Sequence, residues 1–185
     1  KKKSEKVLVG VAFNFLLVML FVLPIDLLFQ HLTRGENSLL LYQQFLTWIL
    51  YVIQSSIGIE VYIRGENSTI LAYADIIDME IVAECSGLHE TVFLSLLVLC
   101  FRGVKPMVRA KWAIYAAFFI FVENLIRILS GYYLINIYDF STWDKFHYFW
   151  WHTGQYALIM GVFILWVMTV AGRPENKSVK KNFTN

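Results

Sequence analysis

Long runs of apolar residues, separated by short polar segments, dominate the chain. About 20 such residues cross the hydrocarbon core of a bilayer as a helix. The pattern predicts five membrane-spanning helices, at about residues 7–29, 39–57, 86–101, 112–130 and 150–171. We therefore expect an all-α polytopic membrane protein. Residues 1–171 would form its single membrane domain, and residues 172–185 would follow as a basic cytoplasmic tail.

The periodicity changes in a segment that spans residues 59–84. Residues 60–63 and 69–73 alternate between polar and apolar positions, and the residues between them include Gly65 and Asn67. Alternation of this kind around a Gly/Asn turn is typical of two paired strands. We therefore expect a small extracytoplasmic β-hairpin between the second and third spans.

Polar and aromatic residues refine the picture of the spans. Gln43, Gln44 and Gln54 interrupt the second span, and we expect them to face other helices rather than lipid. We expect Gly131 to close the fourth span. Residues 132–149 then form an aromatic-rich connection, which is typical of the headgroup level of a membrane.

Composition and charge agree with a membrane protein. Hydrophobic residues make up 58% of the chain and charged residues 16%. The net charge of +2 comes from short clusters rather than from a basic groove, so the expected partner is the lipid bilayer and not nucleic acid. Residues 102–111 and the tail hold four cations each. Two predicted spans, the fourth and the fifth, separate these segments, so both lie on the same face of the membrane. They predict the cytoplasmic face of a multi-pass protein of the cytoplasmic membrane.

This orientation conflicts with the other end of the chain. Five spans place the lysine-rich amino terminus on the opposite face, where the positive-inside rule disfavours it. The conflict leaves open a re-entrant segment, a sixth crossing or a missing amino-terminal span.

Cys85 is the first candidate for chemistry, because it stands where a polar segment meets the third apolar run. We expect it in the first turn of the helix, where unpaired N–H groups favour a thiolate over a thiol. An ordinary cysteine has a pKa of about 8.5, and lowering that pKa activates the sulfur as a nucleophile.

Two more polar residues are expected near the same membrane face. Arg127 lies about one turn before the end of the fourth span, and His152 lies near the start of the fifth. A thiolate, an imidazole that moves its proton and a guanidinium that stabilises an oxyanion are suited to acyl transfer. Glu123 and Asn124 precede Arg127 by four and three residues, so they share its helical face and would orient it.

Alternatives exist for each role. His147 competes with His152, and His89, one turn after the thiol, could be a base, a supporting donor or a packing residue. Arg127 could form a structural pair with Glu123. The His-Glu pair that starts at residue 89 is not followed by a second histidine at position 93, so we expect no metal, and we expect no cofactor. Cys100 is expected to be a core residue.

The segments Glu84-Cys85-Ser86-Gly87-Leu88 and Glu123-Asn124-Leu125-Ile126-Arg127-Ile128, together with His152, lie on successive spans. In this arrangement the chain resembles the exosortase/archaeosortase family of integral-membrane cysteine transpeptidases, over about residues 58–171, and it looks like a short bacterial member. The resemblance implies that Cys85 is the nucleophile, Arg127 an essential cation and His152 the third member.

The resemblance also implies a function. Substrates would be membrane-anchored proteins with a carboxy-terminal sorting signal, which the enzyme would cleave on the extracytoplasmic side before it passes the acyl group to an acceptor. The segment around His152 matches the family loosely, so His147 stays open. The alternative function is a non-catalytic membrane scaffold or partner-binding protein in which Arg127 and Glu123 form a structural pair.

Overall fold

The computed structural model describes residues 2–33, 38–73, 77–102 and 104–171. The chain divides into two compact units, each assembled from separate stretches of sequence. We call them the helical unit, with stretches Lys1–Leu28, Glu90–Ile120 and Phe149–Asn185, and the sheet unit, with stretches Phe29–His89 and Phe121–Tyr148. Each unit has its own hydrophobic core, so each is described separately.

Three long apolar helices and a short one contribute residues to the helical unit, and their remaining residues belong to the sheet unit. They are α1 (Lys2–Thr33), α3 (Leu88–Cys100), α4 (Pro106–Ile137) and a helix that starts with α5 (Phe140–Phe149) and runs on through η2 (Trp150–Gly154), α6 (Gln155–Trp166) and η3 (Val167–Ala171). Proline suits the first turn of α4 because its φ is already helical and its missing N–H is not needed there. The core of the unit gathers buried side chains from all of these helices, including Val22, Leu97, Ile120 and Phe163.

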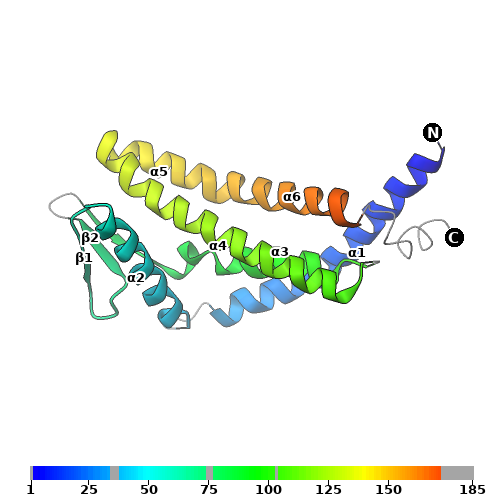
Figure 1. The fold of residues 1–185 in the computed structure, drawn as a ribbon, viewed down its shortest axis with the longest axis horizontal. Helices are drawn as coiled ribbons and strands as arrows, with labels where there is room; N and C mark the ends of the chain where they lie inside the picture. Colours follow the sequence, from blue (N-terminus) through cyan, green and yellow to red (C-terminus); the bar gives the residue numbers. More distant parts are fainter. Residues whose placement is uncertain (1, 34–37, 74–76, 103, 172–185) are drawn as a thin grey trace. The chain divides into compact units, whose positions relative to one another are not determined.

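A small antiparallel sheet and the helix α2 (Leu40–Ser56) form the base of the sheet unit (Figure 1). The strands β1 (Val61–Arg64), β2 (Ile70–Tyr73) and β3 (Ile77–Glu80) pair in sequence order. Leu71 of β2 and Leu46 and Leu50 of α2 are buried in one core, which the second half of α4 joins through Ile128.

Buried polar pairs fix the sheet against α2. The hydroxyl of Tyr73 donates to the Gln54 Oε1 at 2.9 Å and accepts from the Gln54 Nε2 at 2.8 Å. Gln43 Nε2 donates to the Ile81 carbonyl at 3.0 Å. We had expected the glutamines of the second apolar run to face other helices. Instead, they bond to the segment that forms the sheet. A buried amide needs partners, and the sheet's carbonyl and hydroxyl groups supply them.

The predicted hairpin is present and larger than expected. Its two strands form at almost the predicted residues, and the turn uses Gly65 at φ +88°. A third strand, Ile77–Glu80, pairs with the second in the register Tyr73↔Ile77 to Ile70↔Glu80. Its side chains alternate between half-buried and exposed positions, which is the pattern of a strand with one face on the core.

The helices differ from the predicted spans in their ends. The helices Pro106–Ile137 and Phe140–Val170 are long and apolar enough to cross a membrane. The third apolar run forms only the 13-residue helix α3, which is shorter than the roughly 20 residues that a span needs. The residues of the expected aromatic connection are also mostly helical, in α4 and α5. Five spans remain a prediction, and the predicted tail, residues 172–185, lies outside the described residues.

Gly131 does not end α4, contrary to expectation. A Cβ on this residue would lie 2.6 Å from the Nε1 of Trp143, so glycine is needed here for the close approach of an α5 side chain. The helix continues through it for another six residues.

Candidate functional site

Cys85 lies in η1 (Ala83–Ser86), a short 3₁₀ turn between the sheet and α3. Its N–H donates to the Val82 carbonyl at 3.0 Å, and Gly87 then adopts φ +71° before the α-helix begins at Leu88. The expectation that Cys85 occupies the first turn of the helix was therefore wrong, because the left-handed glycine separates the two segments.

Arg127 brings a buried positive charge to the main chain of Cys85. The side chain is only 7% exposed, and its Nη2 donates to the Cys85 carbonyl at 3.3 Å and to the Asn124 Oδ1 at 2.6 Å. The other two nitrogens, Nε and Nη1, are buried and have no hydrogen-bond partner among the residues that the structure describes. The guanidinium is thus anchored at one nitrogen and keeps donors at two others.

Asn124 joins the 3₁₀ turn to the arginine. It is 1% exposed, and its Nδ2 donates to the Ser86 carbonyl at 2.9 Å while its Oδ1 accepts from Arg127. The spacing of three residues along α4 places both side chains on one face of that helix. A Cβ at Gly87 would lie 2.8 Å from the Asn124 Cγ, so the turn can approach the asparagine only because residue 87 is glycine.

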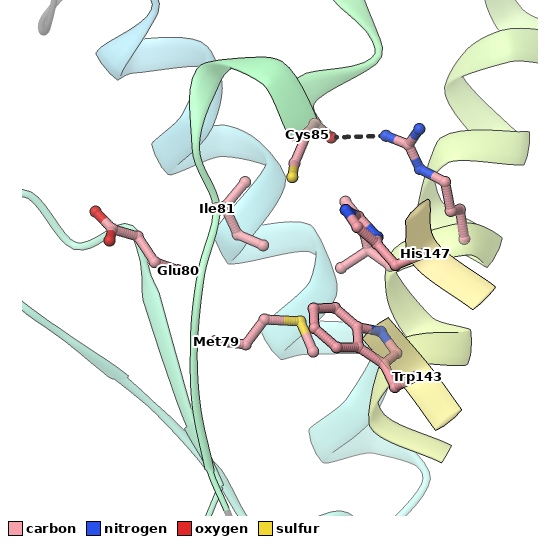
Figure 2. A pocket seen from close by; sticks show the side chains of 8 residues that line it. Met79, Glu80, Ile81, Cys85, Trp143 and His147 are labelled. Carbon is pink, nitrogen blue, oxygen red and sulfur yellow. Dashed lines mark hydrogen bonds between the residues drawn. The ribbon is translucent and has the colours of Figure 1, made fainter. Parts of the chain in front are cut away.

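A pocket of about 70 Å³ opens beside these groups (Figure 2). It has room for a few water molecules or a small polar group. Its lining comes from β3 and the turn that follows, from α4 and from α5: Met79, Glu80, Ile81, Cys85, Arg127, Ile128, Trp143 and His147. The pocket therefore combines a thiol, a guanidinium and an imidazole within the sheet unit.

His147 is the histidine that lines this pocket. Its ring stacks on the ring of Trp143, one turn earlier in α5, with centroids 5.0 Å apart and an angle of 25° between the planes. Figure 2 shows both rings on the α5 side of the pocket, across from the β3 segment that carries Met79 and Ile81. Stacking fixes the orientation of the imidazole with respect to the pocket.

The other predicted histidines lie elsewhere. His152 belongs to η2 in the helical unit, where its ring makes an edge contact with Trp151 at 4.9 Å. His89 bonds through Nε2 to the Thr33 hydroxyl at 2.8 Å and contacts the Phe29 ring, which fits a packing residue. Cys100 packs at the edge of the helical unit's core.

A comparison with protein-family models gives one match. The model of the transmembrane exosortase family (EpsH) matches residues 6–169, which is most of the chain. The chain belongs to the transmembrane exosortase family. A search of curated proteins and a search of solved structures found no match.

Family membership gives the exosortase a class of activity. Exosortases are membrane proteins, and at the level of the family they are membrane cysteine peptidases or transpeptidases that act on membrane-associated substrates with carboxy-terminal sorting signals. Within the described ranges, no group of three His, Cys, Asp or Glu side chains of this exosortase gathers to hold a metal ion.

Sequence reasoning missed several pocket residues of the exosortase. Met79 belongs to the third strand and Ile81 is the residue after it, in a segment where only a two-stranded hairpin was expected. Trp143 was assigned to an interfacial belt. Its spacing of four residues from His147 was the available signal, since such pairs share a helical face.

Proposed function

We propose that this exosortase is a cysteine transpeptidase or peptidase that cleaves the carboxy-terminal sorting signal of membrane-anchored proteins through a thioester at Cys85. The observation that carries the proposal is the state of Arg127. Its guanidinium is buried and is anchored to the main chain of residue 85. Two of its nitrogens, Nε and Nη1, have no acceptor within the described part of the chain. A buried donor without a partner costs about 1–3 kcal/mol, so this site favours a ligand that brings acceptor oxygens.

The reaction follows from these groups. The Cys85 thiolate attacks the carbonyl carbon of a substrate peptide bond, which forms a C–S bond and an oxyanion. The N–H groups of Arg127 stabilise that oxyanion, since fixed donors in a water-poor site are already oriented toward the developing charge. Collapse of the intermediate breaks the C–N bond, and the leaving amine takes the proton that an imidazole received from the thiol.

The second half of the reaction restores the enzyme. A nucleophile of the acceptor, or water, attacks the thioester carbonyl, the C–S bond breaks and the thiol is regenerated. Transpeptidation and hydrolysis share the thioester and differ only in the attacking group. The positive-inside pattern and the family support a multi-pass protein whose Cys85 faces the extracytoplasmic side of the cytoplasmic membrane.

His147 is our first choice for the imidazole. It lines the same pocket as Cys85 and Arg127, and stacking on Trp143 holds its ring. His152, the choice that the family resemblance implies, is the competitor. Asn124 is a positioning residue in this proposal, because it bonds both to the turn that carries the thiol and to the guanidinium.

The test is the pH dependence of Cys85 alkylation in intact cells. The chain carries Cys100→Ala, and the probe is a membrane-impermeant maleimide. We expect fast labelling with an apparent pKa below about 8.5, the value of an ordinary thiol. Arg127→Ala should raise this apparent pKa, because it removes the nearest fixed positive charge. Lys145→Ala, which removes an exposed cation of α5, is the matched control and should leave the pKa unchanged.

The two histidines are separated in the same assay. His147→Ala should change the labelling profile and His152→Ala should not; the reverse result would make His152 the third member. An ordinary thiol pKa that is indifferent to Arg127→Ala and to both histidine substitutions would contradict catalysis and favour the scaffold. Labelling only after permeabilisation would contradict an extracytoplasmic site.

A further inference from the structure

A second cavity lies within the helical unit, and none of the proposed chemistry uses it. Its volume is about 360 Å³. Side chains from α3, the first half of α4, α6 and η3 line it: Leu94, Val98, Trp112, Tyr115, Ala116, Phe119, Val162, Phe163, Leu165, Trp166 and Thr169. All of these except Thr169 are apolar or aromatic. The lining is suited to a hydrocarbon chain.

One polar group in the lining is left without a partner. Trp166 is 4% exposed, and its indole Nε1–H is buried with no hydrogen-bond acceptor in the described ranges of the chain. The ring itself is well packed, with the Phe101 ring against it at 5.3 Å. A buried tryptophan N–H usually finds an acceptor. An occupant of this cavity that carries a carbonyl oxygen would supply one.

Thr169 does not compete for that role. Its hydroxyl donates to the Leu165 carbonyl at 2.7 Å, within its own helix. The hydroxyl therefore presents only lone pairs. Trp112 and Tyr115 also line the cavity and carry an N–H and an O–H donor, but both side chains are exposed. Among the lining side chains, the buried donor without an acceptor in the described part of the chain is the indole of Trp166. This buried donor in an apolar cavity matches an ester carbonyl at the top of an acyl chain.

Positive charge stands beside the same cavity. The Nζ of Lys111 lies 5.6 Å from the centroid of the Tyr115 ring, which is part of the wall. Lys111 is exposed, and it follows the basic segment that holds Arg102, Lys105 and Arg109. The ammonium of Lys111, above an aromatic wall of the cavity, attracts an anionic headgroup.

We propose that the helical unit binds an anionic glycerophospholipid of the bilayer. One acyl chain fills the cavity, its ester carbonyl accepts the hydrogen bond of Trp166, and its phosphate lies against Lys111. Basic pockets among membrane helices commonly bind anionic headgroups, and this one combines that charge with a chain-sized apolar cavity.

Native mass spectrometry of the full chain tests the proposal. The protein is transferred to micelles that contain equal amounts of phosphatidylglycerol and phosphatidylcholine, and the retained lipids are counted. We expect one phosphatidylglycerol per chain to be retained in preference to phosphatidylcholine. Lys111→Gln should reduce that preference about fivefold, the effect of one lysine near an anionic lipid surface. The matched control is Lys105→Gln. Lys105 is an exposed lysine of the same segment, and it does not line the cavity.

A second variant tests the donor. Trp166→Phe keeps an aromatic ring against Phe101 and removes the N–H, so retention of both lipids should fall about fivefold, which corresponds to one ordinary hydrogen bond. Equal retention of the two lipids by the unaltered chain would overturn the proposal. Equal effects of Lys111→Gln and Lys105→Gln, or a lipid-free dimer that persists through delipidation, would also overturn it.

Discussion

Replacing Gly87 by alanine should disturb the Cys85 pocket through Asn124. Gly87 adopts φ +71°, and a left-handed backbone costs a residue with a Cβ about 1–2 kcal/mol. The new Cβ would also lie 2.8 Å from the Cγ of Asn124, a distance that real contacts do not reach. Asn124 is almost fully buried, and its backbone is part of α4, so its side chain must move from its present position.

That displacement sets the size of the effect. It breaks the bond of Asn124 to the Ser86 carbonyl and its bond to Arg127. A neutral hydrogen bond contributes about 0.5–1.5 kcal/mol and a bond to a charged group about 1.5–3 kcal/mol. Together with the backbone strain, Gly87→Ala should lower the free energy of unfolding by about 3–6 kcal/mol.

Gly58→Ala is the matched control. Gly58 has φ +84°, so it carries the same backbone strain, but nothing lies within 4 Å of the Cβ that the substitution adds. This variant should lose only about 1–2 kcal/mol. The free energy of unfolding is measured on the detergent-solubilised chain by denaturant titration with circular dichroism, and the rate of Cys85 alkylation is measured beside it. Losses that agree within about 0.5 kcal/mol, the usual additivity error, with unchanged alkylation in both variants, would refute the reasoning.

Two more predictions concern the sheet unit. Burial raises the pKa of the Tyr73 hydroxyl from its ordinary value of about 10 to about 12. The folded state therefore favours the neutral hydroxyl. This contribution to stability is complete below pH 10 and is lost as the pH rises toward 12. The unfolding free energy of the unaltered chain should consequently fall more steeply over this interval than that of Tyr73→Phe, and parallel curves would disprove the assignment. Gly131→Ala should push Trp143 away from its place, because the new Cβ would lie 2.6 Å from the indole nitrogen, and should destabilise the chain by about 1–3 kcal/mol. Cys85 alkylation should change with it, whereas Gly161→Ala, where a Cβ meets nothing within 4 Å, should be tolerated; equal behaviour of the two variants would contradict the packing role of Gly131.

The apolar runs, the alternating segments and the glycines of the sequence were sufficient to predict α2 and the first two strands. The second apolar run was expected at about residues 39–57 and forms the helix Leu40–Ser56, which ends just before Gly58. The first two strands also lie within a residue of their predicted places. The strand Ile77–Glu80 was missed because its alternation is short and acidic, and because pairing with Ile70–Tyr73 is what makes it a strand.

Tertiary contacts decide the remaining features. Gly131 was interpreted as a helix end, and its actual constraint is the side chain of Trp143, which no local pattern reveals. Cys85 and Arg127 were expected near the same membrane face. The structure shows that Arg127 Nη2 donates to the Cys85 carbonyl, and the level of both residues in the membrane stays a prediction. The placement of Cys85 in a helix failed because the left-handed conformation of Gly87 was not foreseen.

The hydrogen bond that Arg127 makes at Cys85 ends on a main-chain carbonyl. A carbonyl is present whatever side chain residue 85 carries, so the guanidinium keeps its anchor when the sulfur is removed. The Cys85→Ala variant should therefore still bind its substrate but should not cleave it. Cross-linking of that variant in the membrane offers a way to capture the natural substrate as an intact complex.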